Sequence, residues 1–197
     1  MSTLKLVYKL EDLLYLNMKK YKNLFGATDN QIASLENLFE LELPADFKEY
    51  YKLKDGSLNT DILHLIIHNV SYSSFVLMPL KEIKKTKVYL FDHDKKVDMD
   101  YDKYEKFDIR IKPYLSNKKW LPFAHTKSGS LYLMLDYDPS EEGKAGQILC
   151  YVCEPRFVYY VGETFSELLE KTISNLERLN KIGYDMKEPR RITGLFT

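Results

Sequence analysis

The first quarter of the chain carries apolar residues at the three- and four-residue spacing of amphipathic helices. This spacing predicts a first helix from about Lys9 to Leu24, with Gly26 available as its C-terminal stop. Thr28 and Gln31 fit the capping box that opens a second helix, whose apolar positions run on to Leu43. The chain is therefore expected to begin with helices.

The middle of the chain predicts shorter elements. A helix is expected from Pro44 to Leu53, because the missing N–H of proline costs nothing in a first turn. Two apolar runs without helical spacing, Asp61 to Val70 and Ser74 to Met78, predict strands, although the first run also fits a buried helix. A basic helix is predicted from Pro79 to Lys87, followed by a charged excursion outside the core from Phe91 to Arg110.

The pattern changes to strands after Trp120. Leucines and polar or larger residues alternate from Leu131 to Tyr137, and two further runs, Gln147 to Cys153 and Arg156 to Val161, are rich in residues that pack well on a sheet. These runs predict three adjacent antiparallel strands. A last helix should begin at the Thr164 capping box and lie across the sheet. Its apolar stripe consists of Phe165, Leu168, Leu169, Ile173, Leu176 and Leu179.

The elements together predict the α+β class: a single domain with N-terminal helices and a central antiparallel β-sheet covered by helices, including a C-terminal one. With 197 residues, one domain over 1–197 is expected, with its core at about 28–182, the excursion at about 91–110 and a tail at 183–197.

Composition narrows the classes of partner. The 29 basic and 29 acidic side chains give a net charge of zero, which disfavours a general nucleic-acid binder. No apolar run approaches the length of a membrane span, and acidic residues interrupt the N-terminal segment where a secretory signal must be apolar. We therefore expect a cytoplasmic protein with no membrane partner.

Candidate metal and redox residues occur in two places. Cys150 and Cys153 form a C-x-x-C, but within a strand the two point to opposite faces, so buried structural cysteines are expected. His64 and His68 have the spacing of a helical metal site but lack the glutamate of a zinc protease and a third ligand. No metal and no cofactor are expected.

Asp98, Asp100 and Asp102 match the first three acidic ligand positions of a calcium-binding loop. Lys103 stands where that loop needs glycine, and Ile109 where it needs a bidentate glutamate. A solvated charged segment is expected instead, able to offer negative charge to a basic partner.

Catalytic groups are not recognisable in the remaining motifs. Ser128, Gly129 and Ser130 lack the surroundings of a nucleophile elbow or a phosphate loop and predict a turn. Glu141 and Glu142 lie side by side in a hairpin loop, with nothing to separate their pKa values for acid and base chemistry. The sequence therefore predicts a protein that is not an enzyme.

Several short motifs in order carry a resemblance to a known family. They are the Leu43–Tyr51 helix start followed by Asp55-Gly56, the Trp120-Leu121-Pro122 segment, the Leu135-Asp136 strand, the Gly146-Gln147-Ile148 strand and the final Thr164–Leu169 helix start. Together they resemble the SMI1/KNR4 family, part of the SUKH superfamily, over about residues 32–179. The chain departs from the family in Ser128-Gly129-Ser130, where Gly-Gly-Asp is common, and in its long 91–110 excursion.

The resemblance implies a non-catalytic α+β module that binds another protein. Bacterial members are associated with immunity against toxins, often nucleases, whereas fungal relatives regulate cell-wall synthesis and signalling as scaffolds. The abundance of Lys, Tyr, Asn and Ile suggests an AT-rich bacterial genome and favours immunity over the scaffold alternative.

A basic toxin would favour carboxylates in the loops around the sheet. The candidate partner-binding residues are Tyr137, Asp138, Glu141, Glu142, Asp98, Asp100 and Asp102.

Overall fold

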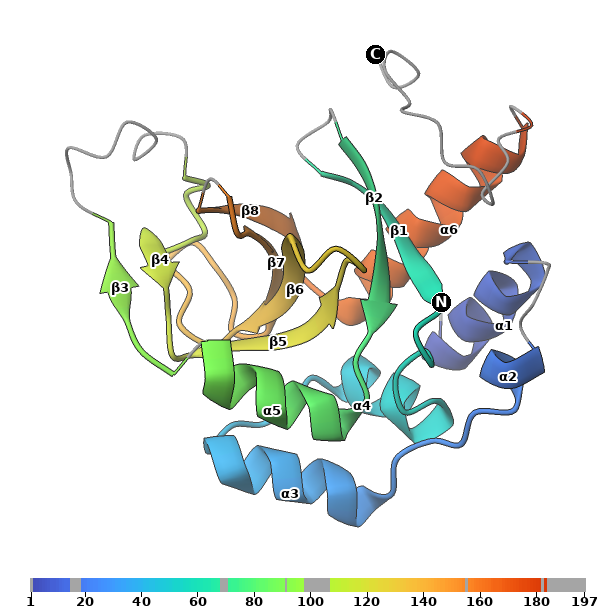
Figure 1. The fold of residues 1–197 in the computed structure, drawn as a ribbon, viewed down its shortest axis with the longest axis horizontal. Helices are drawn as coiled ribbons and strands as arrows, with labels where there is room; N and C mark the ends of the chain where they lie inside the picture. Colours follow the sequence, from blue (N-terminus) through green and yellow to red (C-terminus); the bar gives the residue numbers. More distant parts are fainter. Residues whose placement is uncertain are drawn as a thin grey trace.

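Helices precede, interrupt and follow a six-stranded sheet in the computed structural model, which describes residues 2–14, 19–67, 71–90, 92–97, 107–154, 156–181 and 183 (Figure 1). The helices are α1 (Thr3–Leu13), α2 (Lys19–Lys22), α3 (Asp29–Phe39), α4 (Ala45–Leu53), α5 (Leu80–Leu90) and α6 (Phe165–Lys181). The strands are β1 (Asp61–Ile67), β2 (Ser71–Leu77), β3 (Lys95–Lys96), β4 (Tyr114–Ser116), β5 (Trp120–His125), β6 (Leu131–Asp136), β7 (Gln147–Val152) and β8 (Phe157–Gly162). The predicted α+β class is confirmed.

The large sheet has the strand order β1-β2-β5-β6-β7-β8, and all neighbouring strands are antiparallel. The sheet is therefore wider than the predicted stretch from Trp120 to Val161, because β1 and β2 pair with each other and then with β5. The earlier of the two apolar runs, left open as strand or helix, is a strand. Trp120 belongs to β5 itself and pairs with Asp136 on β6.

Successive side chains along β6 and β7 point to opposite faces of the sheet, and both faces are buried. Leu133 and Leu135 on β6 and Cys150 on β7 belong to the main core beneath the helices. Met134 and Leu149 point the other way into a second buried cluster. The alternation was predicted, but burial of both faces was not.

The segment predicted as an excursion outside the core is exposed at residues 92–96, whereas its described end, residues 107–110, lies against that second face, so only part of the segment is outside the core. Phe107 packs in the second cluster beside Ile111, which follows the segment directly, and the Phe107 ring lies 4.8 Å from the Phe157 ring between centroids. The Arg110 guanidinium stacks 3.3 Å from the Tyr160 ring centroid. Most of this stretch is polar by composition, and Phe107 near its end packs on the second face.

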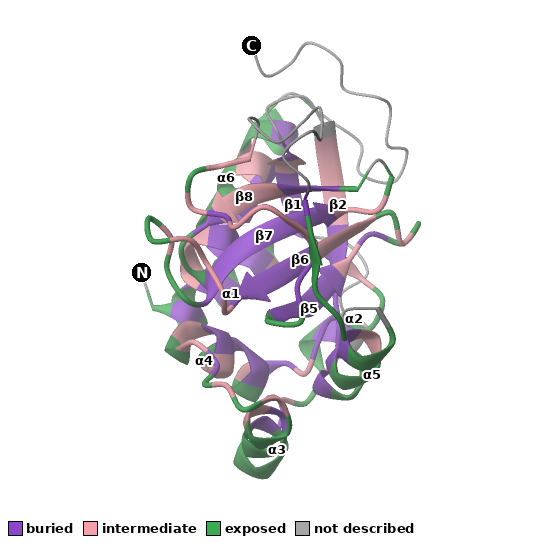
Figure 2. Ribbon diagram, turned by 90° about the vertical axis from the view of Figure 1, so that its left-hand side faces the viewer, coloured by how far each residue is buried: buried purple, intermediate pink, exposed green. Residues whose placement is uncertain are grey.

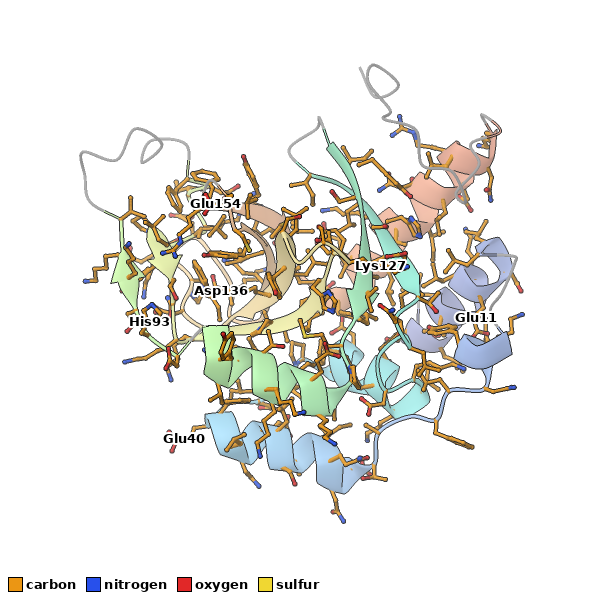
Figure 3. The ribbon with its side chains drawn as sticks, viewed as in Figure 1. Glu11, Glu40, His93, Lys127, Asp136 and Glu154 are labelled. Atoms are coloured by element: carbon orange, nitrogen blue, oxygen red, sulfur yellow. The ribbon has the colours of Figure 1, made fainter. Side chains whose placement is uncertain are left out.

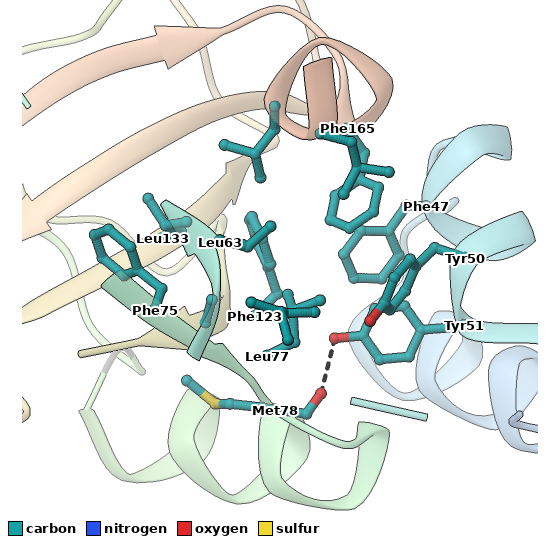
Figure 4. Packing of buried hydrophobic residues seen from close by; sticks show 14 of the residues in the cluster. Phe47, Tyr50, Tyr51, Leu63, Phe75, Leu77, Met78, Phe123, Leu133 and Phe165 are labelled. Carbon is teal, nitrogen blue, oxygen red and sulfur yellow. Dashed lines mark hydrogen bonds between the residues drawn. The ribbon is translucent and has the colours of Figure 1, made fainter. Parts of the chain in front are cut away.

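The main core is built around the aromatic face of α4 (Figure 4). Phe47 stacks on Tyr51 at 4.5 Å between centroids and meets Phe123 and Phe165 edge-on at 5.5 and 5.2 Å. The buried Tyr51 hydroxyl donates to the Met78 carbonyl oxygen at 2.7 Å. One helix turn thus joins β5, α6 and the end of β2.

Helix α6 contacts both edge strands of the sheet, β1 and β8, and also packs on α1. All six apolar residues predicted for its stripe are buried. At the β1 edge, Thr172 and Asn175 bond the backbone of His64. At the β8 edge, Lys171 donates to the carbonyl oxygen of Val161. The helix therefore supplies partners to backbone groups that an edge strand would otherwise leave open.

The N-terminal helices differ from the prediction in their bounds. Helix α1 covers Thr3–Leu13 where a helix from Lys9 to Leu24 was expected, and α2 follows separately. The apolar stripe begins earlier than expected, because Leu6 and Val7 are buried against the same core as Leu10. Buried residues therefore precede residue 28, where the core was expected to begin.

Gly26 allows its own backbone to approach the backbone of α4 closely. A Cβ at Gly26 would lie 1.8 Å from the Lys52 carbonyl oxygen, so only glycine lets this connection pass over α4.

Helices α3 and α4 follow the sequence signals closely. The Thr28–Gln31 capping box is present, and α3 ends at Phe39, before the expected Leu43, because Glu40 adopts a left-handed conformation with φ of 52°. Pro44, the predicted first residue of the next helix, is the N-cap of α4, which begins one position later at Ala45.

Candidate functional site

The loop between β6 and β7 is fixed by a buried pair. The Gln147 side-chain amide donates to the Asp136 carboxylate at 2.9 Å and to the Arg110 carbonyl oxygen at 2.8 Å. Burial raises the pKa of Asp136, although the hydrogen bond from the Asp138 backbone N–H opposes the shift. Asp136 lies on the sheet where β6 ends (Figure 3). This pair explains why the loop residues that follow are held in place.

Tyr137 and Asp138, two predicted partner-binding residues, are engaged within the fold. The half-buried Tyr137 hydroxyl donates to the Glu42 carbonyl oxygen at 3.0 Å, and burial raises the pKa of Tyr137. Asp138 forms an ion pair with Lys112 and accepts a 2.9 Å hydrogen bond from the Asn117 amide. The Asp138 charge is therefore compensated before any partner arrives.

Glu141 and Glu142 are exposed, and within the described ranges neither carboxylate has an ion-pair partner. Their surroundings leave both charges open to a partner. The other predicted acidic residues, Asp98, Asp100 and Asp102, lie outside the described residues.

A pocket of about 420 Å³ lies beside Tyr137, between the ends of α3 and α5 and the start of β5. We call it the α5–β5 pocket. Its walls are mainly apolar and include Phe39, Leu41, Val88, Trp120, Leu121 and Tyr137. Glu40, Asp92, Lys118 and Lys119 add charge at its margin. Glu40 and His93, the neighbour of Asp92, are labelled at the same end of α5 in Figure 3. A pocket of this kind suits an apolar side chain flanked by polar groups.

Lys87 brings a buried ammonium group to this pocket. Its Nζ donates to the Lys118 carbonyl oxygen at 2.5 Å. Burial lowers the pKa of Lys87 to about 8, an effect that the nearby Asp94 and Asp92 carboxylates oppose. The side chain therefore joins α5 to the segment that leads into β5, and it forms part of the pocket wall.

Large apolar side chains are exposed next to the pocket. Val88 and Tyr89 at the end of α5 are 58% and 85% exposed, and Leu38 on α3 is 46% exposed. Exposed apolar groups that adjoin a pocket are typical of protein-binding surfaces. Val88 and Tyr89 lie beyond Lys87, where the basic helix was predicted to end, and outside the stripe that Leu80 and Ile83 form on the buried side of α5.

The histidine and cysteine candidates are structural where the structure describes them. His64 is buried, and its ring bonds the Tyr72 hydroxyl and the Asp61 carbonyl oxygen. Cys150 is buried and Cys153 half-buried, and both are free thiols on opposite sides of the sheet. Position 68 lies outside the described residues. Within the described ranges, no group of three or more His, Cys, Asp or Glu side chains could hold a metal ion.

A search of the described helices finds none that is long and apolar enough to cross a membrane.

Comparison with known families matches residues 26–171 to the model of the SMI1 / KNR4 family (SUKH-1). The match spans α3 through the first part of α6, and it includes all residues that line the α5–β5 pocket. No curated protein matches the chain.

Proposed function

Because this chain belongs to the SMI1/KNR4 family (SUKH-1), we propose that it is a protein-binding module that neutralises a cognate bacterial toxin by binding to it. The observation that carries the proposal beyond the family is the α5–β5 pocket with Val88 and Tyr89 exposed beside it. Interfaces draw most of their binding energy from aromatic or aliphatic anchors seated in such pockets. A toxin side chain in this pocket would place the bulk of this protein over the toxin surface.

The acidic loop residues complete the proposed surface. Glu141 and Glu142 are free to meet basic groups of the toxin, while Tyr137 forms a wall of the pocket and Asp138 holds Lys112. The residues proposed from the sequence to contact the toxin are Tyr137, Asp138, Glu141, Glu142, Asp98, Asp100 and Asp102.

The proposed action needs no catalysis, cofactor or metal. One domain, residues 1–197, would act in the cytoplasm and form a stoichiometric complex. Protection should therefore rise until the two proteins are equimolar and then level off, whereas an enzyme that inactivates the toxin would protect at far lower amounts.

Co-expression tests the proposal. The toxin gene next to the gene for this chain is induced in a sensitive strain with and without the chain, and growth is followed. We expect growth to be restored by the wild-type protein. Full toxicity beside a folded, abundant chain would refute the proposal and leave the cell-wall scaffold as the alternative.

A matched pair of variants links protection to the surface. Tyr89→Ala removes an exposed aromatic ring beside the pocket, and Tyr8→Ala removes an exposed ring from α1. Both rings lie on the outside, so both variants should fold. We expect Tyr89→Ala to weaken toxin binding and Tyr8→Ala to leave it unchanged, as measured by titration calorimetry.

A further inference from the structure

Ion pairs neutralise about half of the lysines whose side chains the structure describes, and isolated exposed lysines such as Lys5, Lys22 and Lys95 have no such pair within the described residues. The paired lysines, on α1, α4, α6, the loops and the sheet margins, each lie within 4.0 Å of a carboxylate. These lysines are Lys9, Lys48, Lys52, Lys54, Lys112, Lys118, Lys127, Lys144 and Lys171.

Helix α5 brings three such lysines together on one short helix. Lys81, Lys84 and Lys85 are exposed, and in the described part of the chain none of them pairs with a carboxylate. Glu82, the acidic residue of this helix, lies 3.6 Å from the His125 ring instead. Lysines three and four residues apart on a helix repel one another, so this arrangement slightly destabilises the free protein.

The same helix surface continues into apolar side chains. Residues four apart share a helix face, which places Val88 above Lys84 and Tyr89 above Lys85. We call Lys81, Lys84, Lys85, Val88 and Tyr89 the α5 ridge. The exposed outer side of α5 is seen in Figure 2. Val88 also lines the α5–β5 pocket, so the charged part of the ridge leads into that pocket.

We propose that the α5 ridge is the docking surface for an acidic patch of a protein partner, whose apolar side chain enters the α5–β5 pocket. This inference rests on the proposed function, since it names the charge that the toxin presents to this side of the molecule. Unpaired lysines beside a desolvated anchor would steer the encounter and fix the register of the complex.

A protein fits the ridge better than other anionic partners. Nucleic-acid binding draws on many phosphate contacts, but the ridge offers three lysines and the chain has a net charge of zero. A membrane-surface helix needs its apolar face free, whereas Leu80 and Ile83 of α5 are buried in the fold. A pocket that accepts one side chain is a feature of protein recognition.

Charge reversal with a matched control tests the inference. The ridge variant carries Lys81→Glu, Lys84→Glu and Lys85→Glu. The control carries Lys5→Glu, Lys22→Glu and Lys95→Glu, which change the net charge equally at exposed lysines elsewhere. Full-length proteins are titrated with a short peptide rich in Asp and Glu around a central Trp, its Lys-substituted counterpart, a DNA duplex and phosphatidylserine vesicles.

We expect the acidic peptide to bind the wild-type protein and the control equally, and the ridge variant about tenfold more weakly, since three attractive surface charge contacts become repulsive. Amide NMR shifts caused by the peptide should lie on α5 and at Lys118 and Lys119. Absent binding, equal loss in both variants, shifts elsewhere, or preference for the basic peptide, the duplex or the vesicles would overturn the inference.

The toxin assay separates this inference from the proposed function. If the wild-type protein and the ridge variant protect cells equally, toxin neutralisation stands and the docking surface is wrong. If the wild-type protein does not protect, the proposed function fails, and the peptide titration still decides whether the ridge binds acidic protein segments.

Discussion

Asn175 on α6 donates a hydrogen bond from its side-chain amide to the backbone carbonyl oxygen of His64 on β1, across 2.9 Å and 111 positions of sequence. The His64 backbone N–H is bonded as well, to the Thr172 hydroxyl at 3.3 Å. One residue of the edge strand thus has both outward backbone groups satisfied by a helix, which closes that point to strand pairing.

Replacing Asn175 with Ala should lower the free energy of unfolding by about 1–3 kcal/mol, because the His64 carbonyl oxygen loses its partner in a partly buried place. Ser174→Ala, at an exposed neighbouring position on α6, is the control and should change stability little. Urea denaturation of both variants provides the measurement. Equal stability of Asn175→Ala and the wild type would show that the bond does not stabilise the edge.

The buried His64 ring should make stability depend on pH. Burial lowers its pKa in the folded protein to about 4 from an ordinary value of 6.5. The unfolded chain therefore binds the proton more readily, and stability present above about pH 6.5 is lost as the pH falls toward 4. The loss should reach about 3 kcal/mol, from the difference between the two pKa values.

Denaturation midpoints between pH 4 and 7 measure this effect in the wild type, in His64→Gln and in the exposed His93→Gln. The pH slope should flatten in His64→Gln alone. The same slope in all three proteins would assign the pH dependence to other groups.

The aromatic cluster on α4 should dominate stability. Phe47→Ala removes a fully buried ring that contacts Tyr51, Phe123 and Phe165, and should cost about 3–5 kcal/mol. Phe25→Ala is the matched control, because the Phe25 ring is exposed. Thermal unfolding should show a large drop for Phe47→Ala and almost none for Phe25→Ala, and similar drops would contradict the packing described here.

Gln147→Leu keeps the side-chain volume but removes the amide that bonds Asp136 and the Arg110 carbonyl oxygen. Both acceptors would be left without this donor, which should lower the free energy of unfolding by about 3 kcal/mol. Hydrogen exchange of the 137–146 loop should also accelerate. Asn37→Leu, an exposed amide on α3, serves as the control, and unchanged exchange in Gln147→Leu would show that the pair does not order the loop.

Local signals predicted much of this fold. The Thr28–Gln31 capping box, the alternation along β6 and the α6 stripe each depend on neighbours within a few residues, and each is present. The bounds of α1 and the cover over the second sheet face depend on long-range packing. Phe107 was predicted to belong to a charged segment outside the core, because only its contacts with distant strands reveal its role.

The candidate site was predicted only in part. Tyr137 was predicted as a partner-binding residue because it lies in a loop beside the sheet, and it lines the α5–β5 pocket. The pocket itself joins segments from α3, α5 and β5, which no sequence spacing relates. Val88 and Tyr89 were missed because the predicted helix ended at Lys87, whereas α5 continues to Leu90 and exposes both residues.

The connection of α6 to both edges of the sheet has a consequence for synthesis on the ribosome. Strands β1 to β8 leave the exit tunnel before the helix that covers their edges, so a nascent chain presents two open edges until α6 emerges. Ribosome-bound chains that end before Phe165 should therefore engage chaperones or aggregate, and the chain should become resistant to protease only once α6 has been made.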